Sequence, residues 1–189
     1  MLEPVNLDGM LNMLKVNLDE TRFAHTLGVC EAAVALAERY GEDKEKAYLA
    51  ALLHDCARGL NYEETLAYCQ ENHIALDEHM KKDINPVHAL IGAHMTKQCY
   101  KIEDEAVIKA IARHATGCEN MTLLDKIIFV ADAIEPNRAG TDVDETRQAA
   151  VRDLNEALPL ALHVKTRYIR AMNGSLHPDS VRMLESLPK

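Results

Sequence analysis

Histidine and aspartate side chains in apolar stretches are the groups in this 189-residue chain best suited to chemistry. An unpartnered polar ring is costly to bury, so a histidine among core-type residues needs a hydrogen-bond partner or a metal ion. Taken singly, each such histidine is better explained by a hydrogen bond to a carbonyl. Together they favour a metal site, because imidazole nitrogens and carboxylates suit divalent transition metals. The candidate ligands are His25 in RFAHTLGV, His54 and Asp55 in AALLHDCAR, His88 in NPVHALIGA, His114 in AIARHATG and Asp132 in IIFVADAIEP.

Asp55 is the candidate with a second role. A carboxylate has two oxygens and can bridge two ions that lie ~3.5–4 Å apart. A water held between two such ions loses a proton near neutral pH and becomes a nucleophile. We therefore expect Asp55 to be the catalytic residue, as the bridging ligand beside the nucleophilic water.

Helices must position these residues, because apolar residues recur at spacings of three and four and no stretch alternates as a strand does. The predicted fold class is therefore all-α. Gly41 suits the left-handed conformation that ends a helix, and Asn85 followed by Pro86 suits a helix start. We expect about eight helices, at residues 19–40, 43–57, 61–71, 85–100, 103–115, 122–134, 143–171 with an interruption allowed near Pro159, and 178–186.

The composition is that of one globular domain spanning residues 1–189. An apolar fraction of 48% and a charged fraction of 27% are typical of a folded chain of this size. The net charge of −9 argues against a nucleic-acid partner, since binding to that backbone requires a dense cationic surface. A negatively charged protein repels a polyphosphate substrate unless positive charge is present at the binding site. Bound divalent cations are the strongest local source of such positive charge.

The cysteines and the apolar stretches indicate a location. The five cysteines form no CxxC pair, and their odd number suits reduced thiols in a cytosol. No apolar run approaches the ~18 residues that a spanning helix needs, and the N-terminus lacks a signal-peptide pattern. We expect a cytoplasmic location and no membrane partner.

The order of the candidate ligands resembles the HD superfamily, whose pattern is an early His, a central His-Asp pair and a distal Asp. Members with two metals have two further histidines between the pair and the last aspartate. The matching residues are His25, His54, Asp55, His88, His114 and Asp132. The resemblance implies an HD-domain helical bundle that holds two divalent metal ions. Iron is the first expectation, and manganese, cobalt, nickel and zinc stay open.

Within that superfamily the chain is similar to the YqeK family, over about residues 17–175. The similarity rests on RFAHTLGV, LAALLHDCARGL, NPVHALIGA, IARHATG and LLDKIIFVADAIEPNR. The last stretch is much longer than the single aspartate that the superfamily requires. The resemblance implies symmetrical hydrolysis of dinucleoside tetraphosphates, chiefly diadenosine tetraphosphate, into two nucleoside diphosphates.

Residues close to the motif are candidates for binding the substrate phosphates. Arg58 follows Asp55 by about one turn, and Arg138 lies in the polar EPNR turn. Thr116 and Gly117 can bring a hydroxyl or main-chain donors to the same phosphates. Each group has a structural alternative. Arg58 can satisfy carbonyls at a helix end, and Thr116-Gly117 can simply be a helix-ending turn.

Asp125 also has two explanations. Its capping-box spacing from Thr122 accounts for it without chemistry. It also shares a helix face with Asp132, so it can act in the second shell by orienting a ligand or a phosphate-binding cation.

The remaining histidines match no ligand position. His94 lies about 240° around the helix from His88, so both cannot easily face one ion. We expect the other four at the surface or in a second shell; they are His73, His79, His163 and His177.

Three other functions fit the same residues. Another HD phosphohydrolase, such as a nucleotidase or an alarmone hydrolase, has the same metal ligands. A di-iron oxygenase and a non-enzymatic nucleotide- or metal-binding module are also compatible with them. ADAIEPNR and the second pair of histidines favour the dinucleotide hydrolase. The long C-terminal helix is expected to be core or a homodimer surface, through Leu154, Leu158, Leu162 and Ile169.

Overall fold

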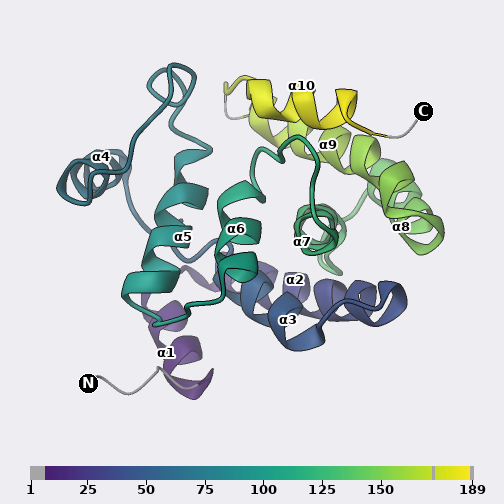
Figure 1. The fold of residues 1–189 in the computed structure, drawn as a ribbon, viewed down its shortest axis with the longest axis horizontal. Helices are drawn as coiled ribbons and strands as arrows, with labels where there is room; N and C mark the ends of the chain where they lie inside the picture. Colours follow the sequence, from purple (N-terminus) through teal and green to yellow (C-terminus); the bar gives the residue numbers. More distant parts are fainter. Residues whose placement is uncertain (1–6, 172, 188–189) are drawn as a thin grey trace.

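The computed structural model describes residues 7–171 and 173–187, and these form ten α-helices and no strand (Figure 1). The all-α prediction is confirmed, with two helices more than the expected eight or so. The helices are α1 (Leu7–Asn17), α2 (Glu20–Tyr40), α3 (Lys44–Leu53), α4 (Tyr62–Glu71), α5 (Val87–Gln98), α6 (Glu105–Arg113), α7 (Leu123–Ile134), α8 (Thr141–Arg152), α9 (Leu154–Ala171) and α10 (Pro178–Glu185). Within the described ranges, no helix is both long enough and apolar enough to span a membrane.

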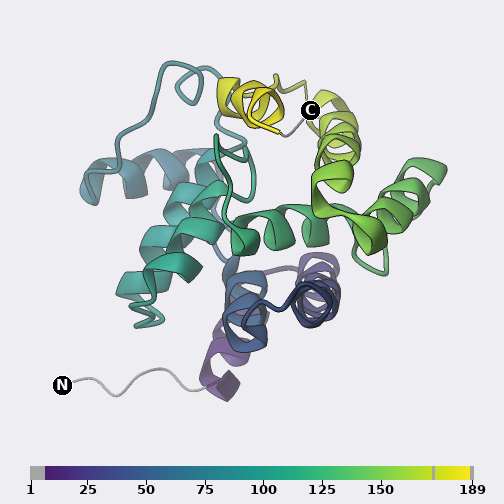
Figure 2. The ribbon, with the colours of Figure 1, turned by 45° about the vertical axis from the view of Figure 1, so that its right-hand side comes forward.

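Helix α7 lies at the centre of the fold. It packs against α2, α3, α6, α8 and α9, and Figure 2 shows it crossing the middle of the molecule. Ten of its twelve residues are buried, which its sequence LLDKIIFVADAI explains, since a helix that is apolar on nearly all sides must be surrounded. A residue on α7 can therefore face any of several neighbouring helices.

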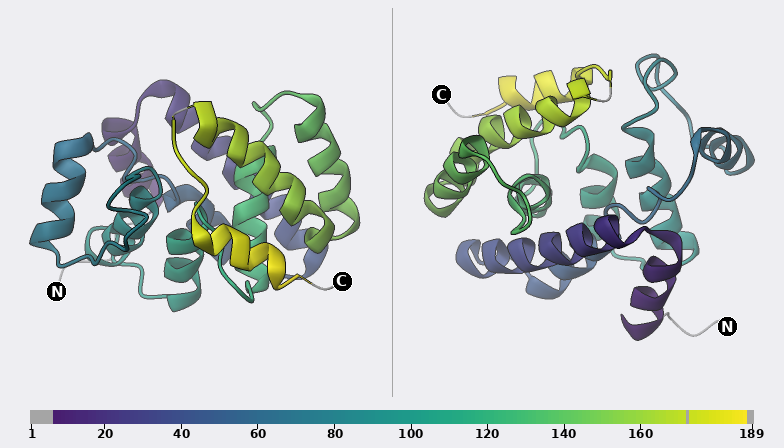
Figure 3. Two further views of the ribbon diagram at one scale, coloured as in Figure 1. Left: turned by 90° about the horizontal axis from the view of Figure 1, so that it is seen from above. Right: turned by 180° about the vertical axis from the view of Figure 1, so that it is seen from behind.

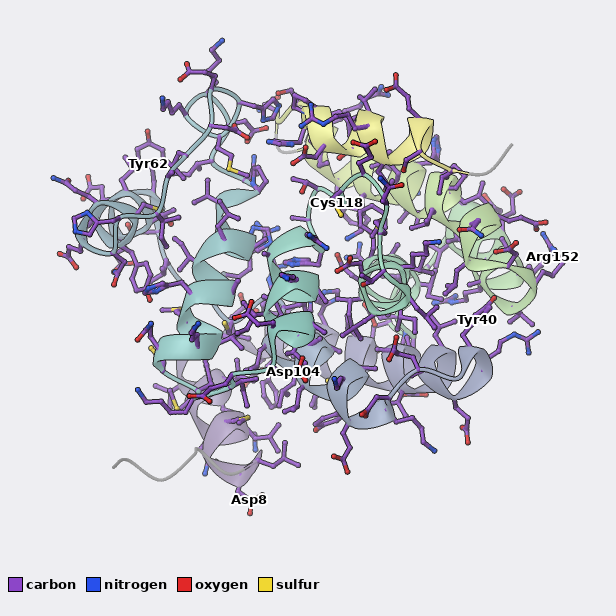
Figure 4. All side chains as sticks on the ribbon, in the orientation of Figure 1. Asp8, Tyr40, Tyr62, Asp104, Cys118 and Arg152 are labelled. Atoms are coloured by element: carbon purple, nitrogen blue, oxygen red, sulfur yellow. The ribbon has the colours of Figure 1, made fainter. Side chains whose placement is uncertain are left out.

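The main core joins α7 to the helices around it, and a smaller apolar cluster lies beneath α4. The smaller cluster is formed by Ala57, Cys69, Met80, Val87 and Ile91. Figure 3 shows α4 on the outside of the fold beside α5. On the other side, the Tyr40 hydroxyl at the end of α2 donates to the Ala150 carbonyl on α8 at 2.7 Å, and Figure 4 labels Tyr40 there.

Several helix ends agree with the sequence prediction. Asp19 caps α2 by accepting from the Arg22 main-chain nitrogen at 2.8 Å. Gly41 ends this helix in the left-handed conformation, with a φ of 74°. Asn61 and Glu64 form the predicted capping box at the start of α4.

Helices α3 and α6 end earlier than predicted, and both of these corrections fall on candidate ligands. Helix α3 ends at Leu53 rather than near Ala57, so His54 is its C-cap and Asp55 lies in the turn that follows. Helix α6 ends at Arg113, which makes His114 its C-cap. After α3 the chain forms tighter bonds between residues three apart, such as Arg58 N to Asp55 O at 2.9 Å.

The predicted helix 143–171 is two helices, divided at Asp153 rather than near Pro159. Asp153 is extended, with a φ of −154° and a ψ of 128°. Its carboxylate accepts from the Asn155 main-chain nitrogen at 2.7 Å and so starts α9. Pro159 lies inside α9, where it removes one main-chain donor without ending the helix. Asn85 was also predicted wrongly as a cap, because Pro86 precedes α5 with no side-chain cap bond.

The first prediction concerns Asp125, which lies in the first turn of α7 and forms a capping box with Thr122. Its Oδ2 accepts from the Thr122 main-chain nitrogen at 2.9 Å and from Arg113 Nη1 at 2.8 Å. Asp125→Ala removes both bonds from a buried position and should lower the free energy of unfolding by about 2 kcal/mol. Urea unfolding measures this loss, and Thr122→Ala is the matched control with a loss of about 1 kcal/mol. Metal content should stay at the wild-type level. A fall in it would give Asp125 a role beyond capping.

Candidate metal centre

Six side chains from five parts of the fold converge beside the end of α7. His25 comes from α2, His54 and Asp55 from the end of α3, His88 from the start of α5, His114 from the end of α6 and Asp132 from α7. His25 is half-buried and the other five are buried. Together with residues of α9 and of the 175–180 segment, five of the six line a cavity of about 1170 Å³. The structure therefore brings together all six predicted ligands.

Asp55 is at the middle of this cluster. Its Oδ1 lies 3.2 Å from His88 Nε2 and 3.5 Å from His114 Nε2. Its Oδ2 lies 3.7 Å from His54 Nε2. The two oxygens of Asp55 thus face different histidines.

A second carboxylate completes the group on the α2 side. Asp132 Oδ1 lies 3.2 Å from His25 Nε2. In each of three overlapping sets, the possible ligand atoms lie within 4.8 Å of one another. The sets are His25, His54 and Asp55; His54, His114 and Asp132; and Asp55, His88 and His114. His54, His114 and Asp55 each belong to two sets, so the ligand atoms form one continuous cluster.

Hydrogen bonds on the outer side of each ring fix its orientation. The Nδ1 atoms of His54, His88 and His114 lie 2.6, 2.5 and 2.7 Å from the carbonyl oxygens of Ala51, Asn85 and Ile111. A carbonyl only accepts, so Nδ1 carries the proton and, in the neutral ring, Nε2 presents its lone pair to the cluster. His54 Nε2 is buried without a hydrogen-bond partner among the described residues. This arrangement is the one that a metal-binding histidine requires.

The contact between His88 and His114 points to the same conclusion. Their Nε2 atoms lie 3.1 Å apart, and when both rings are neutral two lone pairs face each other. A cation between these atoms and Asp55 removes the repulsion. The donor set of imidazole nitrogens and carboxylate oxygens fits a divalent transition metal.

His25 is held by a carboxylate instead of a carbonyl. Its Nδ1 lies 3.2 Å from Glu135 Oε1. Gly28 lets α2 approach this carboxylate, because a Cβ on Gly28 would lie 2.5 Å from Glu135 Oε2. In metal sites a carboxylate often binds the outer nitrogen of a metal-binding histidine. Glu135, the glutamate of the EPNR turn, has this position beside His25.

Burial and charge set the pKa values in the metal-free cluster. Burial is the main cause that lowers the pKa of His54 to about 4 and that of His88 to about 3. Burial also acts against the charge of His25, but Asp132 and Glu135 outweigh it and raise the His25 pKa to about 9. The Asp55 pKa is held well below its usual range because His54 and Arg58 outweigh burial. The carboxylates therefore stay ionised and the two buried rings stay neutral.

Four cationic side chains bind the two ligand carboxylates. Arg22 Nη1 lies 3.0 Å from Asp55 Oδ2, and Arg58 Nε lies 3.4 Å from Asp55 Oδ1. Arg138 Nη2 donates to Asp132 Oδ1 at 3.1 Å, and Lys165 Nζ donates to Asp132 Oδ2. With Glu135 included, four cations face three carboxylates. Asp19, Glu20 and Asp83 also line the cavity, so the excess of cationic side chains is confined to the surroundings of the two ligand carboxylates.

The predicted phosphate-binding residues lie in different surroundings. Arg58, Arg138 and Thr116 line the cavity, whereas Gly117 is not among its lining residues. Gly117 has a φ of 69°, and its nitrogen donates to the Arg113 carbonyl at 2.7 Å, which is the geometry of a helix-ending turn. The Thr116 hydroxyl donates to the Gly117 carbonyl at 3.0 Å.

The other histidines and Asp125 lie apart from the ligand atoms. Asp125 binds Thr122 and Arg113, and His94 contacts the Tyr68 hydroxyl at 3.0 Å. His73 and His163 are exposed. His177 is buried in the cavity wall, where its Nε2 binds Asp77 at 2.8 Å, and His79 contacts the Ser175 hydroxyl at 3.0 Å.

Sequence reasoning missed Arg22, Glu135 and Lys165. Arg22 and Glu135 are part of the stretches RFAHTLGV and ADAIEPNR, within three residues of a ligand. Lys165 had a weaker signal. It occupies the apolar face of α9, seven residues after Leu158, where a lysine needs a buried partner.

Comparisons with known proteins identify the family of this chain. The chain matches the HD domain family over residues 22–137. It is 38% identical over 183 residues to a protein from Halalkalibacterium halodurans named symmetrical bis(5'-nucleosyl)-tetraphosphatase, and the match covers 97% of each chain. A Bacillus subtilis protein of the same name is 38% identical over 178 residues, which cover 93% of this chain and 94% of that one.

A solved structure is similar over nearly the whole chain. A protein from Clostridium acetobutylicum, described as a predicted HD superfamily hydrolase involved in NAD metabolism, matches with a TM-score of 0.89 and 39% identity. The match covers 96% of both chains. The chain belongs to the HD domain family, and within it to the group of the symmetrical bis(5'-nucleosyl)-tetraphosphatases.

The second prediction is that the metal-free protein loses stability in acid before its carboxylates titrate. His54 and His88 have pKa values of about 4 and about 3 when folded, against 6.5 as the ordinary value. The unfolded chain therefore binds more protons below pH 6.5, and stability falls from there toward pH 4. Each histidine contributes a loss of roughly 3 kcal/mol over this range. His25 does not offset it, because its raised pKa stabilises the fold fully below pH 6.5.

Urea unfolding in the presence of a chelator, between pH 7 and pH 4, measures this slope. His54→Gln should flatten it, while His163→Gln, at an exposed position of α9, should leave it unchanged. An unfolding free energy that is constant over this range would contradict the assignment of neutral, buried rings.

Proposed function

We propose that this protein hydrolyses dinucleoside tetraphosphates, chiefly diadenosine tetraphosphate, symmetrically into two nucleoside diphosphates. The observation that carries the proposal is the position of Asp55, which lines the large cavity and whose two oxygens face different histidines. The relatives named symmetrical bis(5'-nucleosyl)-tetraphosphatase support the choice of substrate.

The ligand cluster divides naturally into two sets that share Asp55. One set consists of Asp55 Oδ1, His88 and His114, and the other of Asp55 Oδ2, His54, His25 and Asp132. We propose that each set holds one divalent ion, with iron as the first candidate and manganese, cobalt, nickel and zinc as alternatives. Two ions held there would supply a water that ionises near neutral pH and would neutralise charge on the phosphates.

Three arginines are placed to hold the polyphosphate above this cluster. Arg22 and Arg58 approach from the Asp55 side, and Arg138 approaches from the Asp132 side. The Arg138 guanidinium stacks on the Tyr168 ring at 4.5 Å, and its Nε is buried with no partner among the described residues. A guanidinium held in this way has a donor available for a phosphate oxygen.

Symmetrical cleavage fixes how the substrate lies. Attack must occur at a β-type phosphorus, so one nucleoside diphosphate lies against the ligand cluster and the other extends outward. The cavity wall formed by α9 and the 175–180 segment, with Tyr168, Ser175 and His177, encloses the inner half.

Several sequence predictions remain part of this proposal. They are a single domain over residues 1–189, the absence of a nucleic-acid partner, a cytoplasmic location and a homodimer. A nucleotidase or alarmone hydrolase is the second candidate function, because the same ligand cluster serves other phosphohydrolases.

The third prediction tests the function directly. Metal-reconstituted protein incubated with diadenosine tetraphosphate should yield ADP as the only nucleotide product. Equal amounts of AMP and ATP would exclude symmetrical cleavage, and faster turnover of nucleoside monophosphates would favour the nucleotidase. Asp55→Ala should lose both metal and turnover, since both metal sets lose a ligand. Asp8→Ala, on the exposed surface of α1 (Figure 4), is the control and should retain both.

The fourth prediction separates phosphate binding from metal binding. Arg138→Ala should weaken ADP binding about 10- to 100-fold, the loss expected for a hydrogen bond between charged groups. Its metal content, determined by elemental analysis, should equal that of the wild type. Arg152→Ala, at the exposed end of α8, is the matched control with unchanged ADP affinity. Loss of metal from the Arg138 variant would contradict its assignment to phosphate.

A further inference from the structure

Among the described residues that line the cavity, Lys165 is the one lysine or arginine that the proposed function does not use. It comes from α9, outside the residues 22–137 that match the HD domain family. Its Nζ donates to Asp132 Oδ2 and, at 3.0 Å, to the carbonyl oxygen of His114. It also lies 4.5 Å from the centre of the Phe129 ring. Lys165 therefore links the main chain of His114 to the side chain of Asp132, and both residues are candidate ligands.

The exposed fraction of its side chain separates Lys165 from the arginines. The Arg22, Arg58 and Arg138 side chains are 39%, 26% and 16% exposed, whereas that of Lys165 is 8% exposed. The arginines bind only carboxylates among the ligand groups, and they can leave these when ions and phosphates arrive. Lys165 is tied to a main-chain carbonyl as well, and Phe129 closes its other side. It consequently stays beside Asp132.

The two oxygens of Asp132 are thus in different situations. Oδ1 faces His25 and Arg138, while Oδ2 accepts a charge-assisted hydrogen bond from the buried ammonium. A carboxylate can bind an ion through one oxygen or through both. A cation fixed at Oδ2 disfavours the approach of a second cation to that atom.

We propose that Lys165 is a positioning residue that restricts Asp132 to binding metal through Oδ1 alone. A catalytic metal site needs a coordination position that is free for water or substrate. By occupying Oδ2, Lys165 keeps Asp132 from filling this position. The role rests on the metal centre of the proposed function, but it does not depend on which phosphate compound is cleaved.

Lys165→Met tests the role, because it keeps an unbranched chain over Phe129 and removes the charge and the donors. The variant should bind Mn²⁺ at least as tightly as the wild type, since a nearby cation is lost and Asp132 gains a free oxygen. The cobalt-loaded variant should show a changed visible absorption spectrum, as expected when a ligand oxygen is added. With diadenosine tetraphosphate, kcat should fall about 10- to 100-fold, with a smaller change in KM.

Lys126→Met is the matched control. Lys126 lies on α7 and donates to Asn155 on α9 at 2.7 Å, outside the cavity lining. This variant should keep the wild-type Mn²⁺ affinity, cobalt spectrum and kcat. Lys165→Gln is a second test in case the methionine variant does not fold. The shorter glutamine side chain cannot reach both Asp132 and His114. This variant should therefore also show a changed cobalt spectrum and a lower kcat, as the methionine variant does.

The readouts distinguish this role from its alternatives. A tenfold weaker Mn²⁺ affinity with an unchanged cobalt spectrum would overturn the proposal and assign Lys165 to assembly of the ligand set. A wild-type kcat and spectrum in either Lys165 variant would also overturn it. If the substrate were a different phosphate compound, the spectral change would still appear, so a failure of the proposed function would be recognised separately.

Discussion

The structure depends on the burial of one ionised carboxylate, that of Asp55, at a place where four helix termini meet. A buried charge is tolerated only when it is paired and hydrogen-bonded. Asp55 has partners on every side, with His54, His88 and His114 around it and the guanidinium groups of Arg22 and Arg58 above it. The surrounding helices must end where they do for these partners to reach it, and this requirement explains much of the local architecture.

The ends of α3 and α6 illustrate the requirement. A helix terminus leaves its last carbonyls without a partner in the helix. His54 and His114 follow those termini, and each binds through Nδ1 the carbonyl three residues earlier. His88 repeats the pattern at the start of α5, where Asn85 supplies the carbonyl. Main-chain carbonyls thus orient these three rings. The outer partners of His25, Asp55 and Asp132 are side chains instead, namely those of Glu135, Arg22, Arg58, Arg138 and Lys165.

This dependence also explains what could be predicted from the sequence. The spacing of apolar residues and the punctuation by Asp19, Gly41 and Asn61 were sufficient for the all-α fold. The order of histidines and aspartates was sufficient to select the six converging side chains. The ends of α3 and α6 were missed, because hydrophobic periodicity continues through His54 and His114 while the hydrogen bonding does not. Lys165 was missed because the sequence shows it to be on an apolar face but does not show which buried carboxylate lies opposite.

The cavity has two parts with different origins along the chain. All six converging residues lie within the residues 22–137 that match the HD domain family. The wall opposite them comes from α9 and the segment that starts α10, through Lys165, Tyr168, Ser175 and His177. The ligand cluster is suited to attack on a phosphate group, and many different substrates contain such a group. Selection among substrates requires contacts beyond the phosphate, and the C-terminal wall is the part of the cavity that can provide them. Lys165 and Tyr168 join the two parts. Lys165 binds Asp132 directly, and Tyr168 stacks on the Arg138 guanidinium, which in turn binds Asp132.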